Sequence, residues 1–395
     1  MAIELAVELI GAVAFVLGVD LVTAGLYAVV PGPRVKGYAC DRAGEPLPYV
    51  LNGLRVYVAG LMLVYWLHQL ELVPLDYIAT HFWSVAMAAN VVGLVTALGL
   101  VLWGLRPGRY QGARRCLTAD QAGNAAARAE FERPHEAREQ TFGFHYYTGT
   151  EFNPRFGALD IKMYLYLVGA LLLHVTLLSA LARHVDMQPD GAPSRAMVIY
   201  QAMFAWFIVE YIYHEHVHLY TYDLFAEKVG FKLTWGCLVF YPFFYSVGVW
   251  SLVPALTPEA DLSITQCLLV AVLFLVGWIM TRGANMQKYY FKLDPRASFL
   301  GVRPVTVPGT RILCSGFWGA SRHLNYLGEI LQGLALALPG VLATGSLWPL
   351  LYPAYYVALF IPRQIEDDEI CAAKYGSKWA EYVRRVPYRI IPFIY

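Results

Sequence analysis

The stretch ITQCLLVAVLFLVGWIMT, residues 264–281, contains no charged side chain and decides the fold class. As an α-helix it would be about 27 Å long, close to the thickness of the hydrocarbon core of a bilayer. Comparable apolar runs occupy residues 6–30, 50–71, 82–105, 162–182, 197–219, 237–254, 327–343 and 346–361. The sequence therefore predicts an all-α polytopic membrane protein with nine transmembrane helices. Pro242 interrupts the pattern within 220–255, which predicts that a tenth, shorter or re-entrant segment can form there.

The composition agrees with this fold class. Of the 395 residues, 58% are hydrophobic and 15% are charged, whereas about a quarter of the residues of soluble domains are charged. The net charge of +1 gives no reason to expect a nucleic-acid partner. No repeat or low-complexity linker divides the chain. We therefore expect a single integral-membrane domain over residues 1–395, with N-terminal helices in 1–105, a cytoplasmic segment at 106–161 and a core part at 162–395.

The distribution of Lys and Arg predicts the orientation in the membrane. The connections 72–81 and 255–263 contain neither residue, whereas 106–161 and 282–326 are rich in both. Because cytoplasmic loops carry the excess of positive charge, the N-terminus is expected outside and the C-terminus in the cytoplasm. This pattern is compatible with the endoplasmic reticulum and with a bacterial inner membrane.

Two polar segments lie beside predicted membrane ends. Residues 315–326 read SGFWGASRHLNY, and a second segment extends from residue 363 to residue 392. Ionisable groups near lipid are costly unless they are paired or bind a ligand. Both segments fall on the predicted cytoplasmic side. The sequence therefore predicts one charged ligand site at the membrane surface.

A pair of lysines precedes the first of these segments. Lys288 and Lys292 are spaced i, i+4 directly after a predicted span, so one helix face presents two ammonium groups. Anchoring at the cytoplasmic interface explains them without any ligand. With Arg322 they also suit the phosphates of a nucleotide. No GxGxxG motif occurs between a strand and a helix, so a dinucleotide would be held by the membrane helices themselves.

A second group of titratable residues lies within 210–218. Glu210, His214 and His218 follow each other at i, i+4, a spacing that can bind zinc or iron. The remaining histidines are dispersed, and a di-iron site needs several clusters. We therefore predict no metal, and interpret these residues as polar groups at a helix end. Glu215, with Asp223 downstream, is expected to line a pocket as an acid or polar anchor.

Four segments resemble the sterol reductase family, which includes C14- and C7-sterol reductases and the reductase domain of the lamin B receptor. They are the GxExNPRxGxxDxK pattern at 149–162, NxQK at 285–288, SGFWGxxRHxNYxGE at 315–329 and the tail at 363–395. Their order and spacing match the family. The resemblance implies NADPH-dependent reduction of a ring double bond of a sterol, at Δ7 or Δ14. The sequence Trp-Gly-Cys-Leu-Val at 235–239 favours Δ7.

The resemblance also implies the residues of the site. The cofactor-binding residues are expected to be Lys288, Lys292, Trp318, Arg322, His323, Asn325, Arg363, Asp367, Tyr375 and Tyr382. An isolated alkene needs a general acid to protonate one carbon before a hydride can add to the other. The candidate acids are Glu215, Asp223, Tyr326, Tyr375 and Tyr382. Asp367 is a candidate for orienting either the nicotinamide or a tyrosine. The expected partners are a sterol and membrane lipids.

Two other functions are compatible with parts of the chain. Arg322-His323 followed by the tail is similar to the isoprenylcysteine carboxyl methyltransferases, which bind S-adenosylmethionine, although Leu324 stands where those enzymes usually have proline. A non-catalytic sterol-binding protein would also keep the membrane fold. It would have no use for the predicted cofactor residues. A reductase is therefore the favoured prediction.

Overall fold

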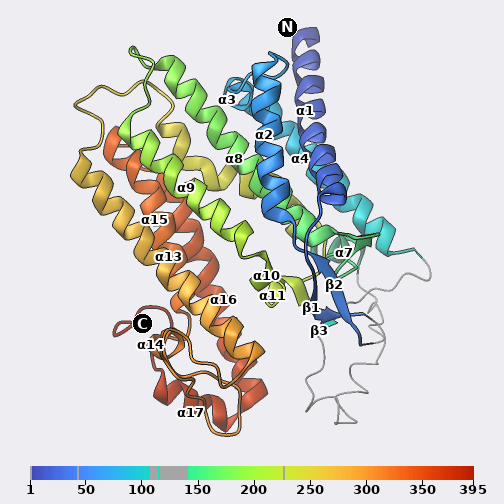
Figure 1. Cartoon of the computed structure of the whole chain (residues 1–395), viewed down its shortest axis with the longest axis vertical. Helices are drawn as coiled ribbons and strands as arrows, with labels where there is room; N and C mark the ends of the chain where they lie inside the picture. Colours follow the sequence, from blue (N-terminus) through green and yellow to red (C-terminus); the bar gives the residue numbers. More distant parts are fainter. Residues whose placement is uncertain (1, 42–43, 107–113, 116–140, 226) are drawn as a thin grey trace. The chain divides into compact units, whose positions relative to one another are not determined.

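The computed structural model describes residues 2–41, 44–106, 114–115, 141–225 and 227–395 (Figure 1). These residues form two compact units: unit 1 comprises Met1–Asp186 and Ala205–Ser246, and unit 2 comprises Met187–Phe204 and Val247–Tyr395. The chain passes from unit 2 to unit 1 within α9 (Arg195–Tyr213) and returns within η2 (Tyr245–Ser251). Residues 107–113 and 116–140, most of the predicted cytoplasmic segment, lie outside the described residues.

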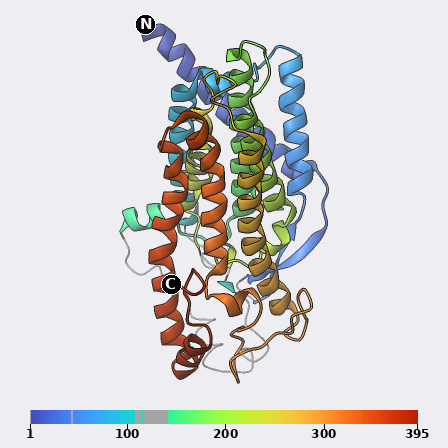
Figure 2. The same ribbon diagram turned by 90° about the vertical axis from the view of Figure 1, so that its left-hand side faces the viewer.

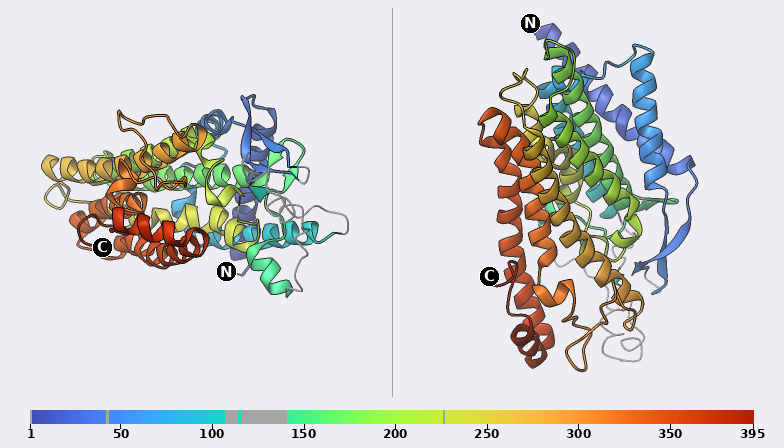
Figure 3. Two further views of the ribbon diagram at one scale, coloured as in Figure 1. Left: turned by 90° about the horizontal axis from the view of Figure 1, so that it is seen from below. Right: turned by 60° about the vertical axis from the view of Figure 1, so that its left-hand side comes forward.

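Unit 1 consists of helices with two small antiparallel sheets. Its elements, besides its part of α9, are α1 (Ala2–Val29), β1 (Arg34–Cys40), β2 (Pro46–Val50), α2 (Gly53–Gln69), α3 (Tyr77–Thr80), α4 (Phe82–Gly104), β3 (Arg114–Arg115), α7 (Phe142–Thr148), β4 (Arg155–Phe156), β5 (Leu159–Asp160), α8 (Ile161–Met187), α10 (Glu215–His218), α11 (Tyr222–Phe225), α12 (Phe231–Trp235) and η1 (Gly236–Phe244). The strand order of the larger sheet is β2-β1-β3, and β4 pairs with β5. The β1–β2 hairpin connects α1 to α2 (Figure 3). The all-α prediction omitted these strands because they are short and lie between the apolar runs.

Helix α8 forms much of the core of unit 1. In its apolar window 72% of the residues are buried, against 11% in α1. Its leucines therefore face other helices, whereas α1 leaves most of its apolar surface for lipid. Gly60 of α2 packs on Leu171 of α8, where an added Cβ would lie 2.8 Å from a leucine methyl carbon. This close approach is possible because glycine has no side chain.

Pro242 changes the geometry of one helix without ending it. α12, the π-helical η1 and the 3₁₀-helical η2 follow each other without a break and form one candidate span, Phe231–Ser251. Pro242 has no N–H for the usual i→i−4 hydrogen bond, so the backbone changes its repeat around it. The tenth segment that the sequence allowed here is therefore part of this single irregular span.

Unit 2 is a helical bundle with a polar end. Its elements, besides its parts of α9 and η2, are α13 (Ile264–Leu293), α14 (Phe317–Ala320), α15 (Leu324–Thr344), η3 (Trp348–Leu350), α16 (Leu351–Tyr375) and α17 (Ser377–Arg385). α15 packs against α13 and against α16 (Figure 2). Gly277 and Gly328 allow the backbones of α13 and α15 to meet, because a Cβ on Gly328 would lie 2.5 Å from the Gly277 carbonyl oxygen.

Seven helices among the described residues are long and apolar enough to cross a membrane, which confirms the polytopic helical fold. They are Glu4–Val29, Phe82–Gly104, Ile161–Met187, Arg195–Tyr213, Phe231–Ser251, Ile264–Leu293 and Leu324–Thr344. The two further predicted spans, 50–71 and 346–361, coincide with α2 and with the first half of α16. α2 has 17 residues, and the second half of α16 is charged. The count of nine spans remains a prediction.

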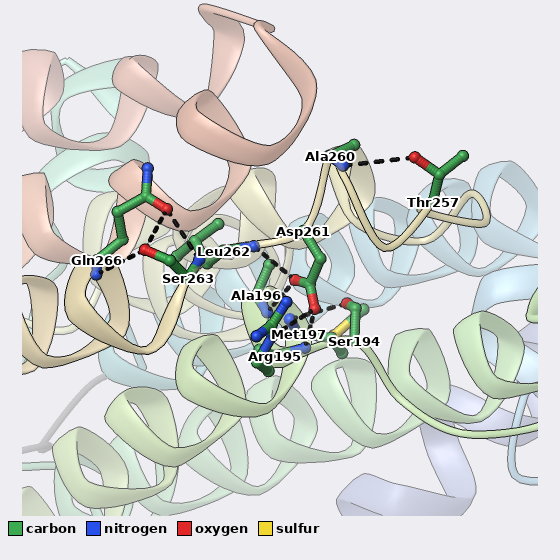
Figure 4. Close-up of polar contacts among 10 residues, drawn as sticks. All are labelled: Ser194, Arg195, Ala196, Met197, Thr257, Ala260, Asp261, Leu262, Ser263 and Gln266. Atoms are coloured by element: carbon green, nitrogen blue, oxygen red, sulfur yellow. Dashed lines mark hydrogen bonds and ion pairs between the residues drawn. The ribbon is translucent and has the colours of Figure 1, made fainter.

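A carboxylate fixes the start of α9 in unit 2 (Figure 4). Asp261 accepts hydrogen bonds from the backbone N–H groups of Arg195, Ala196 and Leu262 at 2.8–2.9 Å, and pairs with the Arg195 side chain at 3.1 Å. Hydrogen bonds from these backbone amides hold the pKa of Asp261 below its ordinary value, in spite of partial burial. The connection 252–263, which precedes α13, is thereby tied to α9.

Candidate functional site

The two polar segments of the sequence meet in unit 2. The backbone N–H of Arg322 donates to the Tyr388 carbonyl at 2.9 Å, and that of His323 donates to the Arg389 carbonyl at 2.8 Å. The Ser321 hydroxyl donates to the carbonyl of Ile390 at 3.0 Å. Residues 315–326 and the tail therefore form one structure, and the single charged ligand site expected there stays a prediction.

A buried ion cluster holds this junction together. Arg322 is 4% exposed, and its guanidinium donates to Asp368 Oδ2 at 3.2 Å and to the carbonyls of Val386 and Pro387 at 3.3 and 3.4 Å. Arg389 lies 3.3 Å from the same carboxylate oxygen. Arg322, predicted to bind a phosphate, is thus engaged with groups of the protein. The sequence analysis did not identify Asp368 and Arg389. The two adjacent acidic residues at 367 and 368 could have indicated that one of them pairs with a buried arginine.

A second set of side chains combines an ammonium group, an aromatic ring and a carboxylate. Lys288 is exposed, and its ammonium lies 4.5 Å from the centroid of the Trp318 ring. The Tyr326 hydroxyl donates to Asp367 Oδ2 at 3.1 Å, and Asp367 is near enough to Lys288 for their charges to attract. We call Lys288, Trp318, Tyr326 and Asp367, together with Asn325, which precedes Tyr326 in the chain, the Lys288 cluster. All five were predicted from the sequence as site residues.

His323 contributes to the site as a neutral ring. Burial lowers its pKa to about 3, and the positive charges of Lys288, Arg322 and Arg363 act in the same direction. Its ring stacks on Tyr326 with centroids 4.8 Å apart, and Tyr326 stacks in turn on Phe360 at 4.3 Å. His323 therefore fixes the plane of the Tyr326 ring and adds no charge at neutral pH.

The other predicted residues lie around these groups. Tyr382 is 3% exposed and packs with Val307, Val386 and Trp379 in a hydrophobic cluster. Burial raises the pKa of Tyr382 well above its ordinary value, so its hydroxyl keeps its proton at neutral pH. Tyr375 ends α16, with the Lys374 ammonium 4.9 Å from its ring centroid.

Lys292 and Arg363 are half-buried. The carbonyl of Lys292 accepts a hydrogen bond from the Arg311 guanidinium at 3.3 Å. This contact joins the end of α13 to the loop that precedes residue 315.

The Lys288 cluster suits a nicotinamide nucleotide. The Asn325 Oδ1 atom is buried and accepts no hydrogen bond within the described residues. Such an acceptor is costly unless a ligand donates to it, and the carboxamide of a nicotinamide is a donor of that kind. The Trp318 ring offers a stacking surface, and Lys288 a positive charge for a phosphate.

Unit 1 contains a separate small cavity. Its lining consists of Tyr27, Gly53, Met163, Tyr166, Leu167, Tyr211, Ile212, Glu215 and His218. Both carboxylate oxygens of Glu215 lie 3.2 Å from the backbone N–H of Gly53, the first residue of α2. Burial raises the pKa of Glu215 to about 7, although this hydrogen bond opposes the shift. Glu215 therefore lines a pocket as predicted, and it also caps a helix 162 residues away.

Asp223 lies beside this cavity in the short helix α11, which contacts the 149–162 segment. The Tyr166 hydroxyl donates to Asp223 Oδ2 at 3.2 Å. The buried Lys162 ammonium donates to the backbone carbonyls of Asp223, Leu224 and Glu227. Lys162 thus fixes the position of α11 and of the residues that follow it. Tyr166 and Tyr211, which line the cavity, were missed because nothing in the sequence separates them from other tyrosines within spans.

The predicted helix face at 210–218 does not form. α9 ends at Tyr213, and α10 begins at Glu215, so His214 and His218 are not on one continuous helix. His214 Nδ1 lies 3.4 Å from a carboxylate oxygen of Glu210, whereas the His218 ring packs on Tyr211 with centroids 3.9 Å apart. The described residues contain no group of three His, Cys, Asp or Glu side chains placed to bind a metal ion.

Comparison with known proteins gives a family match over nearly the whole chain. The sequence profile described as "Ergosterol biosynthesis ERG4/ERG24 family" matches residues 13–395. The predicted resemblance to sterol reductases is thereby confirmed.

Curated relatives cover much of the chain. It is 38% identical over 247 residues to the Delta(14)-sterol reductase of Arabidopsis thaliana, a match over 62% of this chain and 64% of the plant protein. It is 30% identical to the Delta(14)-sterol reductase of Methylotuvimicrobium alcaliphilum over 94% of this chain and 80% of that protein. A match to the Delta(14)-sterol reductase LBR of Gallus gallus, 34% identical, covers 62% of this chain and 38% of the chicken protein. These names do not support the preference for Δ7 drawn from residues 235–239.

Proposed function

The chain belongs to the ergosterol biosynthesis ERG4/ERG24 family, and on this premise we propose that it reduces the C14 double bond of a sterol with NADPH. The relatives named Delta(14)-sterol reductase favour this position over C7. The observation that carries the proposal is the Lys288 cluster, in which an exposed cation, an aromatic ring and an unsatisfied buried acceptor lie at the junction of the two polar segments.

The residues of unit 2 would bind and orient the cofactor. Lys288 would pair with a phosphate, and Asn325 Oδ1 would accept a hydrogen bond from the carboxamide. Asp367, which accepts from Tyr326, would orient either the nicotinamide or that hydroxyl. Arg322 and Asp368 would not contact the cofactor; their ion pair would hold the tail against residues 321–323. NADPH, when bound, supplies the hydride.

The protein must also supply a proton. Protonation of C15 leaves a tertiary cation at C14, which accepts the hydride. Glu215 has a pKa of about 7 and so keeps part of its protons at neutral pH, as a general acid should. Asp223, Tyr326, Tyr375 and Tyr382 are the alternative donors. Aromatic rings beside the reacting carbon would stabilise the cation through their π faces.

We further propose that the Lys288 cluster and the C-terminus lie on the cytoplasmic side of an endoplasmic-reticulum or bacterial inner membrane. Positive residues in 282–326 support this orientation, because cytoplasmic loops carry an excess of Lys and Arg. It would give the cluster access to a soluble dinucleotide.

Incubation with a panel of Δ7, Δ14 and Δ24 sterols tests the proposal. Purified protein in detergent receives each sterol with NADPH, and in parallel with S-adenosylmethionine, and the products are identified by mass spectrometry. We expect loss of the Δ14 bond with NADPH. Methyl transfer would favour the methyltransferase alternative, and sterol binding without any product would favour a non-catalytic binding protein.

A further inference from the structure

A side-chain amide connects α13 to the loop that carries Trp318. Gln287 is 3% exposed. Its Nε2 donates to the Ser315 carbonyl at 3.0 Å, and its Oε1 accepts from the Phe317 N–H at 2.9 Å. The amide thus pairs with the loop backbone in both directions, much as a neighbouring strand would. We call this pair of hydrogen bonds the Gln287 clamp.

Two glycines make the clamp possible. Gly316 lies between the two clamped residues with φ of 63°, and a Cβ there would lie 2.4 Å from Gln287 Nε2. Gly283, one turn earlier on α13, faces Phe317, and a Cβ there would lie 2.2 Å from the ring. Neither space accepts a methyl group without movement. The loop therefore packs closely on α13, with Gly316 against the Gln287 amide and the Phe317 ring against Gly283.

The clamp sets the position of the next residue, Trp318. The indole Nε1 of Trp318 donates to the Ala284 carbonyl at 2.8 Å, and its ring faces the Lys288 ammonium. Gln287 and Lys288 are consecutive on α13, so the clamp and the cation share one rigid helix. Any movement of the loop would change the distance between the Trp318 ring and the Lys288 ammonium.

We propose that Gln287 is a positioning residue for the cofactor: without touching it, the amide holds Trp318 at the distance from Lys288 that NADPH binding requires. This inference rests on the proposed function, because it assigns Trp318 and Lys288 to the cofactor. Gln287→Leu would remove both hydrogen bonds and keep a similar side-chain volume. At about fivefold per lost hydrogen bond, we expect the KM for NADPH to rise by about 10- to 30-fold, with kcat within threefold of the wild type.

A double-mutant cycle tests the proposal. Gln287→Leu, Trp318→Phe and the double variant are compared by KM and kcat, with Gln266→Leu as the matched control. Gln266 is on the same helix at its other end, where it pairs with Ser263. If Gln287 acts through Trp318, the two effects on KM are not additive, and Gln287→Leu adds little in the Trp318→Phe background. Full additivity, or a KM for Gln287→Leu within twofold of the wild type, would overturn the proposal.

Gly316→Ala provides a second variant if Gln287→Leu does not fold. It displaces the clamp while every side chain of α13 is kept, so the KM should rise with little change in kcat. An unchanged KM in a folded Gly316→Ala protein would also overturn the proposal. If the wild-type protein neither binds nor oxidises NADPH, the proposed function itself is wrong, which is a distinct result.

Discussion

Replacement of Lys288 by methionine tests the cofactor site most sharply. Methionine keeps the length of the side chain and removes its charge. Lys288 is exposed and lies over the Trp318 ring, where a cation–π contact is worth about 0.5–1 kcal/mol. We therefore expect a small loss of stability. A charge-assisted hydrogen bond to a phosphate is worth about 1.5–3 kcal/mol, so the affinity for NADPH should fall roughly ten- to a hundredfold.

The assay is a titration of NADPH and NADH into detergent-purified protein, followed by nicotinamide fluorescence. The wild type should prefer NADPH, because Lys288 and Lys292, one turn apart on α13, can pair with the additional phosphate that NADH lacks. Lys378→Met is the matched control, since Lys378 is also in unit 2 and pairs with Glu381 at 3.8 Å. Equal affinity of the wild type for both cofactors, or a Lys288→Met Kd within twofold of the wild type, would refute the reasoning.

Four further results are expected. Asp367→Asn should abolish turnover and leave the protein folded; turnover within a few-fold of the wild type, with an unchanged elution volume in detergent, would remove Asp367 from the site. The wild-type rate should fall as the pH rises through about 7, because the Glu215 carboxyl, with its raised pKa, loses its proton there. Glu215→Gln should be slower, and its rate should not show this fall. A Glu215→Gln variant with the same pH–rate profile as the wild type would exclude Glu215 as the acid. Asp261→Asn should destabilise unit 2 by about 1–2 kcal/mol, measured by thermal unfolding. The folded-state pKa of Asp261 is lowered, so its stabilisation is present above the unfolded pKa and is lost as the pH falls through the folded one, and the wild-type and variant curves should converge in acid. His214→Ala with His218→Ala should lower the melting temperature more than the rate, with full activity in chelator; about one zinc or iron per chain, with activity lost on its removal, would revive a metal site.

Hydropathy predicted the membrane helices, whereas the residues of the candidate cofactor site stay a prediction. The membrane helices follow from apolar runs, since the bilayer requires a helix wherever such a run crosses it. The residues of the Lys288 cluster were predicted because the segments that contain them resemble those of the sterol reductase family in order and spacing. The side-chain contacts inside the cluster could not be predicted, because Tyr326 and Asp367 are 41 residues apart.

Contacts between distant residues account for what the sequence did not show. Glu215 caps α2 from 162 residues away, and Lys162 satisfies carbonyls more than sixty residues on. The helical spacing of His214 and His218 was misleading, since the chain leaves α9 at Tyr213. Arg322 was expected at a phosphate, but its burial beside Asp368 depends on the tail folding back, which no local pattern encodes.

The origin of the two added hydrogens tests the central claim most directly. Purified protein is given a Δ14 sterol with NADPH deuterated at its transferable C4 position in ordinary water, and unlabelled NADPH in deuterium oxide in a second reaction. The position of deuterium in each product is then determined by NMR and mass spectrometry. We expect one deuterium at C14 from the cofactor and one at C15 from the solvent. Deuterium from the cofactor at C15, or recovery of unchanged sterol, would contradict this expectation.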